Sequence, residues 1–323
     1  MDACVGRLYN RFDSFQQRHG WLAFPLAVRQ KYSEDQGGYL AATIAYYGFF
    51  SIFPLLLVAT TTLGFVLRGH PALERRIVGS ALGQFPVIGH ELHVRSLHGD
   101  AFALVFGIAA ALWAGMGAVL AAENAMNQLW GVPFKHRPDF FRARARALVL
   151  LLLLGGGVLA ATALAGAGSV GASYGVAWKV ASIIASVCLD FVVFWVALRL
   201  LTARSVSWSN LRGGAAAAAL AYEALQLLGG YYVGHTLRHA DSLYGTFGLV
   251  LGLLSFIYLA AHALLLAAEG NVVAVRRLWP RSFSVVFEQP ATRADQVALT
   301  QRGKIEERRQ DEHVQIDIPV EDD

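Results

Sequence analysis

Apolar residues gather in six long blocks along the chain, separated by shorter polar segments. Each block holds roughly 20 to 30 residues, and about 20 residues of helix are needed to cross the hydrocarbon core of a membrane. The pattern therefore predicts an all-α, polytopic membrane bundle with six transmembrane helices. The predicted spans cover residues 39–67, 101–130, 147–170, 176–202, 213–232 and 246–275.

The two ends of the chain differ from this six-span domain, which occupies residues 36–280. Residues 1–35 mix basic side chains with apolar ones such as Trp21 and Phe24, which predicts an amphipathic N-terminal helix. The pattern fits a helix lying on the cytoplasmic membrane surface and a packed soluble helix equally well. Residues 281–323 carry charges of both signs and few large apolar side chains, which predicts a polar, partly disordered cytoplasmic tail.

Composition and charge support a membrane protein and orient it. Only 15% of the residues are charged, against about 25% in an average soluble domain. Lys and Arg concentrate in the N-terminal segment, around residues 135–146, around 199–212 and around 276–281. All of these segments fall on one side if both termini are cytoplasmic, as the positive-inside rule expects. Because the basic residues flank spans, they indicate topology and a bilayer partner, and we expect no nucleic-acid partner.

The first predicted span is interrupted by polar residues and a proline in the stretch "AYYGFFSIFP". Pro54 cannot donate a hydrogen bond to the carbonyl of Phe50, so we expect a kink there. In lipid the freed backbone groups must face protein or water. We therefore expect Tyr46 or Tyr47, together with Ser51, to turn toward the bundle interior, where they become candidates for a substrate path.

Three ionisable residues lie near the middle of predicted spans, namely Asp190, Glu223 and His262. A charge near the bilayer centre costs about 2.5–3.5 kcal/mol on insertion scales, so such residues need partners or water. The three residues could form a proton relay, bind a cation or line a hydrated groove for a polar headgroup. The alternative is that each is hydrogen-bonded and only locks helices together.

Two further acids share a local pattern at the cytoplasmic ends of the second and sixth spans. Glu123 lies in "LAAENAMNQLW" and Glu269 in "LAAEGNVVAVRRLW". A carboxylate at a helix C-terminus is unfavourable by about 0.3–1 kcal/mol unless a cation compensates. The favoured interpretation is a pair of structural ion pairs made with Arg276, Arg277 or the basic residues 135–146, and the alternative is a cytoplasmic gate. The neighbouring polar groups that would take part are Asn124, Asn127 and Asn271.

Four histidines in the predicted outer connections are candidates for a metal site, namely His90, His93, His235 and His239. Imidazole is a common ligand of transition metals. Solvated histidines at the interface are the favoured interpretation, because "HELH" lacks the HExxH spacing of zinc proteases. No loop shows a nucleophile, base and orienting group together. We therefore expect no enzymatic activity and no cofactor.

Three stretches together resemble the YihY/BrkB family of bacterial inner-membrane proteins. They are "AATIAYYGFFSIFPLLLV" at 41–58, "AENAMNQLWGV" at 122–132 and "LYGTFGLVLGLLSFIYLAAHALLLAAEGNVVAV" at 243–275. The resemblance covers about residues 35–280 and implies a six-span bundle in the cytoplasmic membrane. Members of the family have been associated with serum resistance and with envelope lipid or lipopolysaccharide traffic, and some carry the label of a ribonuclease, BN.

The buried ionisable residues and the resemblance together predict a transporter or translocator of a lipid, lipopolysaccharide-type or other envelope-related substrate. The alternative is a non-transporting scaffold that supports envelope integrity or serum resistance. A ribonuclease is the least favoured function, because the nearest His and Asp cluster falls in a predicted outer connection, away from tRNA. The pattern does not decide whether the protein forms a homo-oligomer.

Overall fold

A computed structural model describes residues 13–66, 101–170, 176–203, 206–232, 238–282 and 292–316. Within these ranges every regular element is a helix, which confirms the predicted all-α class. Six long helices overlap the six predicted spans. They are α3 (Gly37–Val66), α5 (Ala101–Leu129), α6 (Phe140–Val170), α7 (Val176–Leu201), α8 (Trp208–Tyr232) and α9 (Arg238–Arg276).

Four of these helices contain a stretch long and apolar enough to cross a membrane. In any one of the four, at most 22% of the residues in the apolar stretch are buried inside the protein. A helix that is apolar on its exposed sides needs lipid around it. The six-span count itself remains a prediction, with α6 and α8 occupying the ranges of the other two. The four stretches are Gly37–Leu55, Val105–Leu129, Ile184–Leu201 and Val250–Arg276.

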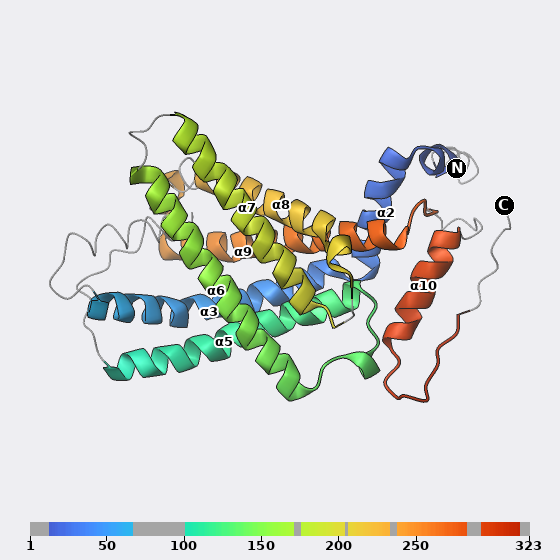
Figure 1. The fold of residues 1–323 in the computed structure, drawn as a ribbon, viewed down its shortest axis with the longest axis horizontal. Coiled ribbons are helices and arrows are strands. Elements are labelled where there is room, and N and C mark those ends of the chain that lie inside the picture. The colour runs from blue at the N-terminus through green and yellow to red at the C-terminus, as the bar shows by residue number, and fades with distance from the viewer. Residues whose placement is uncertain are drawn as a thin grey trace.

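The best-packed part of the bundle lies at one end of the long helices. α3 packs against α5 and α9, while α7 lies between α6 and α8, and α8 also packs on α9 (Figure 1). The main apolar cluster joins the C-terminal parts of α5 and α9 to the beginnings of α3 and α8. Small side chains within it let the helix backbones approach closely. Its most buried members include Ala41, Ala125, Leu129, Leu211, Ala215, Leu265 and Val272.

The N-terminal segment packs on this end of the bundle. A short helical stretch at 13–18 leads through His19 into α2 (Gly20–Glu34). Ala23, Ala27 and Lys31 follow one another at one-turn spacing, and all three are buried on the side of α2 that meets α9. One face of α2 is therefore covered by protein, whereas Trp21 stays 71% exposed.

The C-terminal segment contains a helix that the sequence analysis did not assign. α10 (Arg293–Ile305) begins with a capping box, in which the Thr292 side chain and the Asp295 side chain each accept from the other residue's backbone N–H. α10 lies at the same end of the bundle as α2, near the last turn of α9 (Figure 1). A short 3₁₀ turn, η1 (Phe134–His136), lies in the α5–α6 connection. Ala294, Ala298 and Ile305 are buried, so one side of α10 is covered by protein.

Candidate functional site

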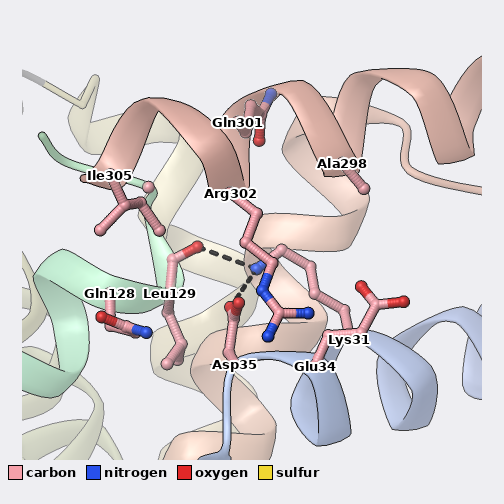
Figure 2. A pocket seen from close by; sticks show the side chains of 10 residues that line it. Lys31, Glu34, Asp35, Gln128, Leu129, Ala298, Gln301, Arg302 and Ile305 are labelled. Carbon is pink, nitrogen blue, oxygen red and sulfur yellow. Dashed lines mark hydrogen bonds and ion pairs between the residues drawn. The ribbon is translucent and has the colours of Figure 1, made fainter. Parts of the chain in front are cut away.

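A buried lysine joins three helices at this end of the bundle. The ammonium of Lys31, on α2, lies 2.8 Å from a carboxylate oxygen of Glu269 on α9 and 2.5 Å from Asp35. It also donates a 3.0 Å hydrogen bond to the carbonyl of Leu129, at the end of α5 (Figure 2). Glu269 is completely buried, and no described residue gives its oxygens a well-aligned hydrogen bond. The Lys31 ammonium therefore compensates the buried charge of Glu269.

A small recess opens beside Lys31, between α2, the end of α5 and α10. Figure 2 shows Arg302 of α10 extending into it toward Asp35. Burial raises the pKa of Asp35 above its ordinary value, although the positive charges of Lys31 and Arg302 oppose that shift. The recess therefore combines cations and carboxylates at close range. Its lining is Lys31, Glu34, Asp35, Gln128, Leu129, Gly131, Ala298, Gln301, Arg302 and Ile305.

Arg281 fastens α10 to α2. Its guanidinium is almost fully buried and binds both carboxylate oxygens of Glu34 at 2.9 Å, while its Nε donates to Asp295 at 2.9 Å. Burial alone would raise the pKa of Asp295, but hydrogen bonds from Ser282 and Thr292 and the charge of Arg281 hold it below its ordinary value. The two parallel hydrogen bonds from Arg281 to Glu34 are the geometry in which arginine binds carboxylates most strongly.

The α5–α6 connection makes a second attachment to the tail. Lys135 forms a 2.8 Å ion pair with Glu307 and donates to the carbonyl of Glu312 at 3.0 Å. In the same connection, Arg137 donates a 2.7 Å hydrogen bond to Asn124. The tail is thus held by basic residues on both sides of the recess.

The two acids at the span ends have different partners from one another. Glu123 lies 3.8 Å from Arg146, which belongs to the basic segment expected to supply its partner. Glu269 pairs with Lys31, which the sequence analysis did not propose. The sequence did contain a signal for this partner, because Lys31 is the last basic residue before the first predicted span. Arg276, an expected partner, donates hydrogen bonds to the Trp130 carbonyl after α5 and to the Gln301 side chain of α10, and its charge also acts on Glu269.

Two of the three predicted asparagines bind backbone groups at helix ends. Asn127 accepts a 2.9 Å hydrogen bond from the backbone N–H of Ala203, beyond the end of α7. Asn271 accepts one from the backbone N–H of Gly214 at 3.1 Å. A Cβ at Gly214 would lie 2.7 Å from the Cβ of Asn271, which is too close for a real contact. The close approach of α8 to α9 therefore requires glycine at position 214. Both asparagines position helices, whatever further role they have.

The ionisable residues within the predicted spans separate into two groups. Asp190 on α7 and Glu223 on α8 are close enough to interact electrostatically, and Tyr222 interacts with both. His262 instead lies 2.7 Å from the hydroxyl of Tyr32 on α2. Burial, with repulsion from neighbouring groups, raises the pKa of Tyr32 to about 12. Among the described contacts, no hydrogen bond or ion pair joins His262 to either acid.

The interrupted stretch of the first span forms one continuous helix through Pro54. Ser51 is buried and donates a 2.7 Å hydrogen bond to a carbonyl one turn earlier. The Tyr47 ring packs against Gly117 of α5 so closely that a Cβ on this glycine would lie 2.8 Å from it. Even so, 42% of Tyr47 and 56% of Tyr46 are exposed. No described hydrogen bond or ion pair links these side chains to the acids of α7 and α8. A kink and a shared cavity remain predictions.

Comparison with known proteins places the chain in a family. The family described as Virulence factor BrkB matches residues 28–282. The chain belongs to the BrkB family. Inner membrane protein YhjD of Escherichia coli (strain K12) is 24% identical over 289 residues, covering 82% of this chain and 85% of the relative. No solved structure matches the chain.

The family match, this relative and the four apolar helices confirm the expected family and the location in the bacterial inner membrane. The matched segment of this BrkB-family protein begins shortly before Lys31 and ends just after Arg281. It therefore contains the buried ion pair and the arginine that fastens the tail, but not α10.

The predicted metal site lies outside the described side chains of this BrkB-family protein. His90, His93 and His235 fall in segments that are not described, and for His239 only the backbone, at the start of α9, is described. Among the side chains that the structure does describe, no three His, Cys, Asp or Glu residues are arranged to hold a metal ion.

Proposed function

We propose that this protein is a transporter or translocator that moves a lipid or other envelope-related substrate, with a path along the junction of α7 and α8. The observation that carries the proposal is that α7 packs against α8, with Asp190 and Glu223, one on each helix, within range of electrostatic interaction. Asp190 lies within a stretch apolar enough to span the membrane. Two neighbouring carboxyl groups in that setting are costly unless a proton, a cation or a substrate group binds between them.

The surroundings of the pair favour binding over a helix-locking role. A lock requires a donor for each carboxyl group, yet among the described residues neither Asp190 nor Glu223 accepts a hydrogen bond or forms an ion pair with a cation. Both side chains are partly exposed. A polar headgroup can therefore meet the acids while its acyl chains stay against the exposed apolar surface of α7. This open arrangement supports a lipid-like substrate.

We further propose that the chain crosses the membrane six times with both ends in the cytoplasm. Two observations support this topology. α2 and α10 lie at one end of the bundle and are joined through Arg281 (Figure 1). The basic segments of the sequence also fall at that end, as the positive-inside rule requires.

Reconstitution into liposomes tests the transport proposal. Movement of fluorescent phospholipids and of lipid A-type substrates should be slowed at least about ten-fold by Asp190→Asn and by Glu223→Gln, since each change removes an ionisable group from the path. The matched control is Glu306→Gln, the same chemical change at a side chain that is 69% exposed in the tail. It should move substrate like the wild type.

Two results would contradict the transport proposal. One is a correctly folded wild type that moves no member of the substrate panel. The other is full activity in both amide variants. If instead both variants only lower the melting temperature, the scaffold alternative gains support. The extensive buried ion pairs between α2, α9 and α10 favour that alternative.

A further inference from the structure

Two tryptophan–arginine pairs interlock where α7 meets α8. Trp195 and Arg199 lie one turn apart on α7, and Trp208 and Arg212 lie one turn apart on α8. The tryptophan rings meet edge to face with centroids 5.2 Å apart, and the Trp195 indole N–H donates to the Trp208 carbonyl at 2.8 Å. Each arginine lies beside the tryptophan of the other helix. The Cζ-to-centroid distances are 6.0 Å for Arg199 and 5.7 Å for Arg212.

The two arginines have no acidic partner in the part of the chain that the structure describes. Among the described residues, no carboxylate lies within ion-pair distance of Arg199 or Arg212. A contact with an aromatic face also leaves the guanidinium N–H donors available. The exposed hydroxyls of Ser207 and Ser209, 2.9 Å apart, flank Trp208 and add further hydrogen-bonding groups. Two neighbouring fixed cations with free donors are suited to an anion that has several oxygens.

The position of this cluster indicates which anion it meets. Arg199 lies in the last turn of the apolar stretch Ile184–Leu201, which places the cluster at the membrane surface. Tryptophan is enriched at the level of the lipid headgroups, and arginine near that surface attracts anionic lipids. Below the cluster, Ile184 and Val192 of α7 are 57% and 49% exposed, which offers an apolar surface for acyl chains.

We propose that Arg199 and Arg212, held by the Trp195–Trp208 pair, bind the phosphate of an anionic phospholipid such as phosphatidylglycerol. Arginine fits phosphate with two parallel hydrogen bonds, which a flexible lysine does not reproduce. The tryptophan pair is already fixed by its own hydrogen bond and ring contacts, so little ordering is needed on binding. Inorganic phosphate shares the headgroup chemistry but not the acyl chains.

This lipid site goes beyond the proposed transport path and does not depend on it. Asp190 precedes Arg199 by nine residues, which is about 14 Å along a helix. A wild-type protein that prefers phosphatidylglycerol but moves no substrate would therefore contradict the transport proposal alone. A wild-type protein that moves substrate but shows no preference for phosphatidylglycerol would contradict only the present one.

Native mass spectrometry of the full-length protein in detergent tests the proposal. The protein is titrated with phosphatidylglycerol and with phosphatidylcholine that carries the same acyl chains. We expect the wild type to bind phosphatidylglycerol about ten-fold or more tightly, and Arg199→Gln/Arg212→Gln to lose that preference, because each arginine contributes about five-fold. The control Arg308→Gln/Arg309→Gln makes the same change in net charge at exposed tail residues and should keep the preference.

Three outcomes would overturn the proposal. The first is equal affinity of the wild type for the two lipids. The second is an equal loss in the control variant, which would indicate general charge attraction. The third is displacement of phosphatidylglycerol by millimolar inorganic phosphate, which would indicate a site for free anions. If the glutamine variant does not fold, Trp208→Leu replaces it. This change retains both charges but removes the ring beside Arg199, so we expect several-fold weaker binding, and an unchanged preference would contradict the proposal.

Discussion

Lys31 shows at the scale of a single residue how one cation can determine the packing of several helices. Taking a carboxylate out of water is costly, and the attraction between opposite charges offsets that cost only when the geometry is good. Lys31 meets Glu269 and Asp35 at ion-pair distance and also binds a carbonyl at the end of α5. The position of α2 against α5 and α9 thus depends on one ammonium group.

The two partners of this pair should respond unequally to substitution. Lys31→Met leaves two buried carboxylates without their cation, and we expect it to destabilise the fold by about 3–5 kcal/mol. Glu269→Gln should cost less, because Lys31 keeps Asp35 as a partner. Thermal unfolding in one detergent measures both, with the exposed Lys304→Met as the control. Equal losses would contradict the expected asymmetry, and no loss in either variant would show that the pair does not hold α2.

At the scale of an element, α10 shows how a charged segment can form a helix that binds its neighbours. Its sequence is polar, and charges of both signs usually indicate a hydrated tail. The fold places Arg281 where it binds Glu34 of α2 and Asp295 of α10 together. Local sequence could reveal the capping box, but not the partner on α2, because that partner is distant in the chain and becomes a neighbour only after folding.

The docking of α10 should depend on pH through Asp295. Its folded-state pKa lies below the ordinary value of about 3.9, so its stabilising effect is fully present above that value and is lost as pH falls through the lowered one. Asp295→Asn should destabilise α10 by about 1–3 kcal/mol, since it removes a capping group and unpairs Arg281. Hydrogen exchange over residues 293–305 measures the effect.

The control for this experiment is Asp311→Asn, the same change at a side chain that is 71% exposed. At pH 7 exchange in α10 should be about five-fold to one-hundred-fold faster in Asp295→Asn than in the wild type, with the control unchanged. The difference should shrink as pH falls below the ordinary aspartate pKa and then through the lowered pKa of Asp295, where the wild-type carboxylate becomes protonated. A difference that is independent of pH would rule out Asp295 ionisation as its cause.

At the scale of the whole molecule, the helices form a bundle whose apolar outer surface needs lipid to cover it. The apolar stretches of four helices are mostly exposed, whereas the tightest packing and nearly all the described ion pairs lie at the end that carries α2 and α10. Apolar surface facing lipid carries no hydrophobic penalty, so these helices can leave their outer apolar sides uncovered by protein. Such a surface is compatible with a substrate that approaches from the bilayer.

Cysteine labelling tests the orientation of the whole molecule. After replacement of Cys4 and Cys188 by serine, single cysteines are introduced as Gly20→Cys and Lys304→Cys, both at exposed positions where a side chain has room. A membrane-impermeant maleimide should label both in inside-out vesicles and neither in right-side-out vesicles. Labelling of both from the outside would reverse the orientation. Labelling of the two from opposite sides would contradict the Arg281 link between α2 and α10.

The sequence by itself determined the helical class, the approximate ranges of the long apolar helices, the family resemblance and the membrane location. These follow from local hydrophobic runs and short motifs, which need no knowledge of neighbours in space. Only the tertiary structure decided that Lys31 compensates Glu269, that the tail docks through Arg281, and that His262 contacts Tyr32 of α2. A charged residue within an apolar run predicts that a partner is present, but the packing of helices distant in the chain decides which residue that partner is.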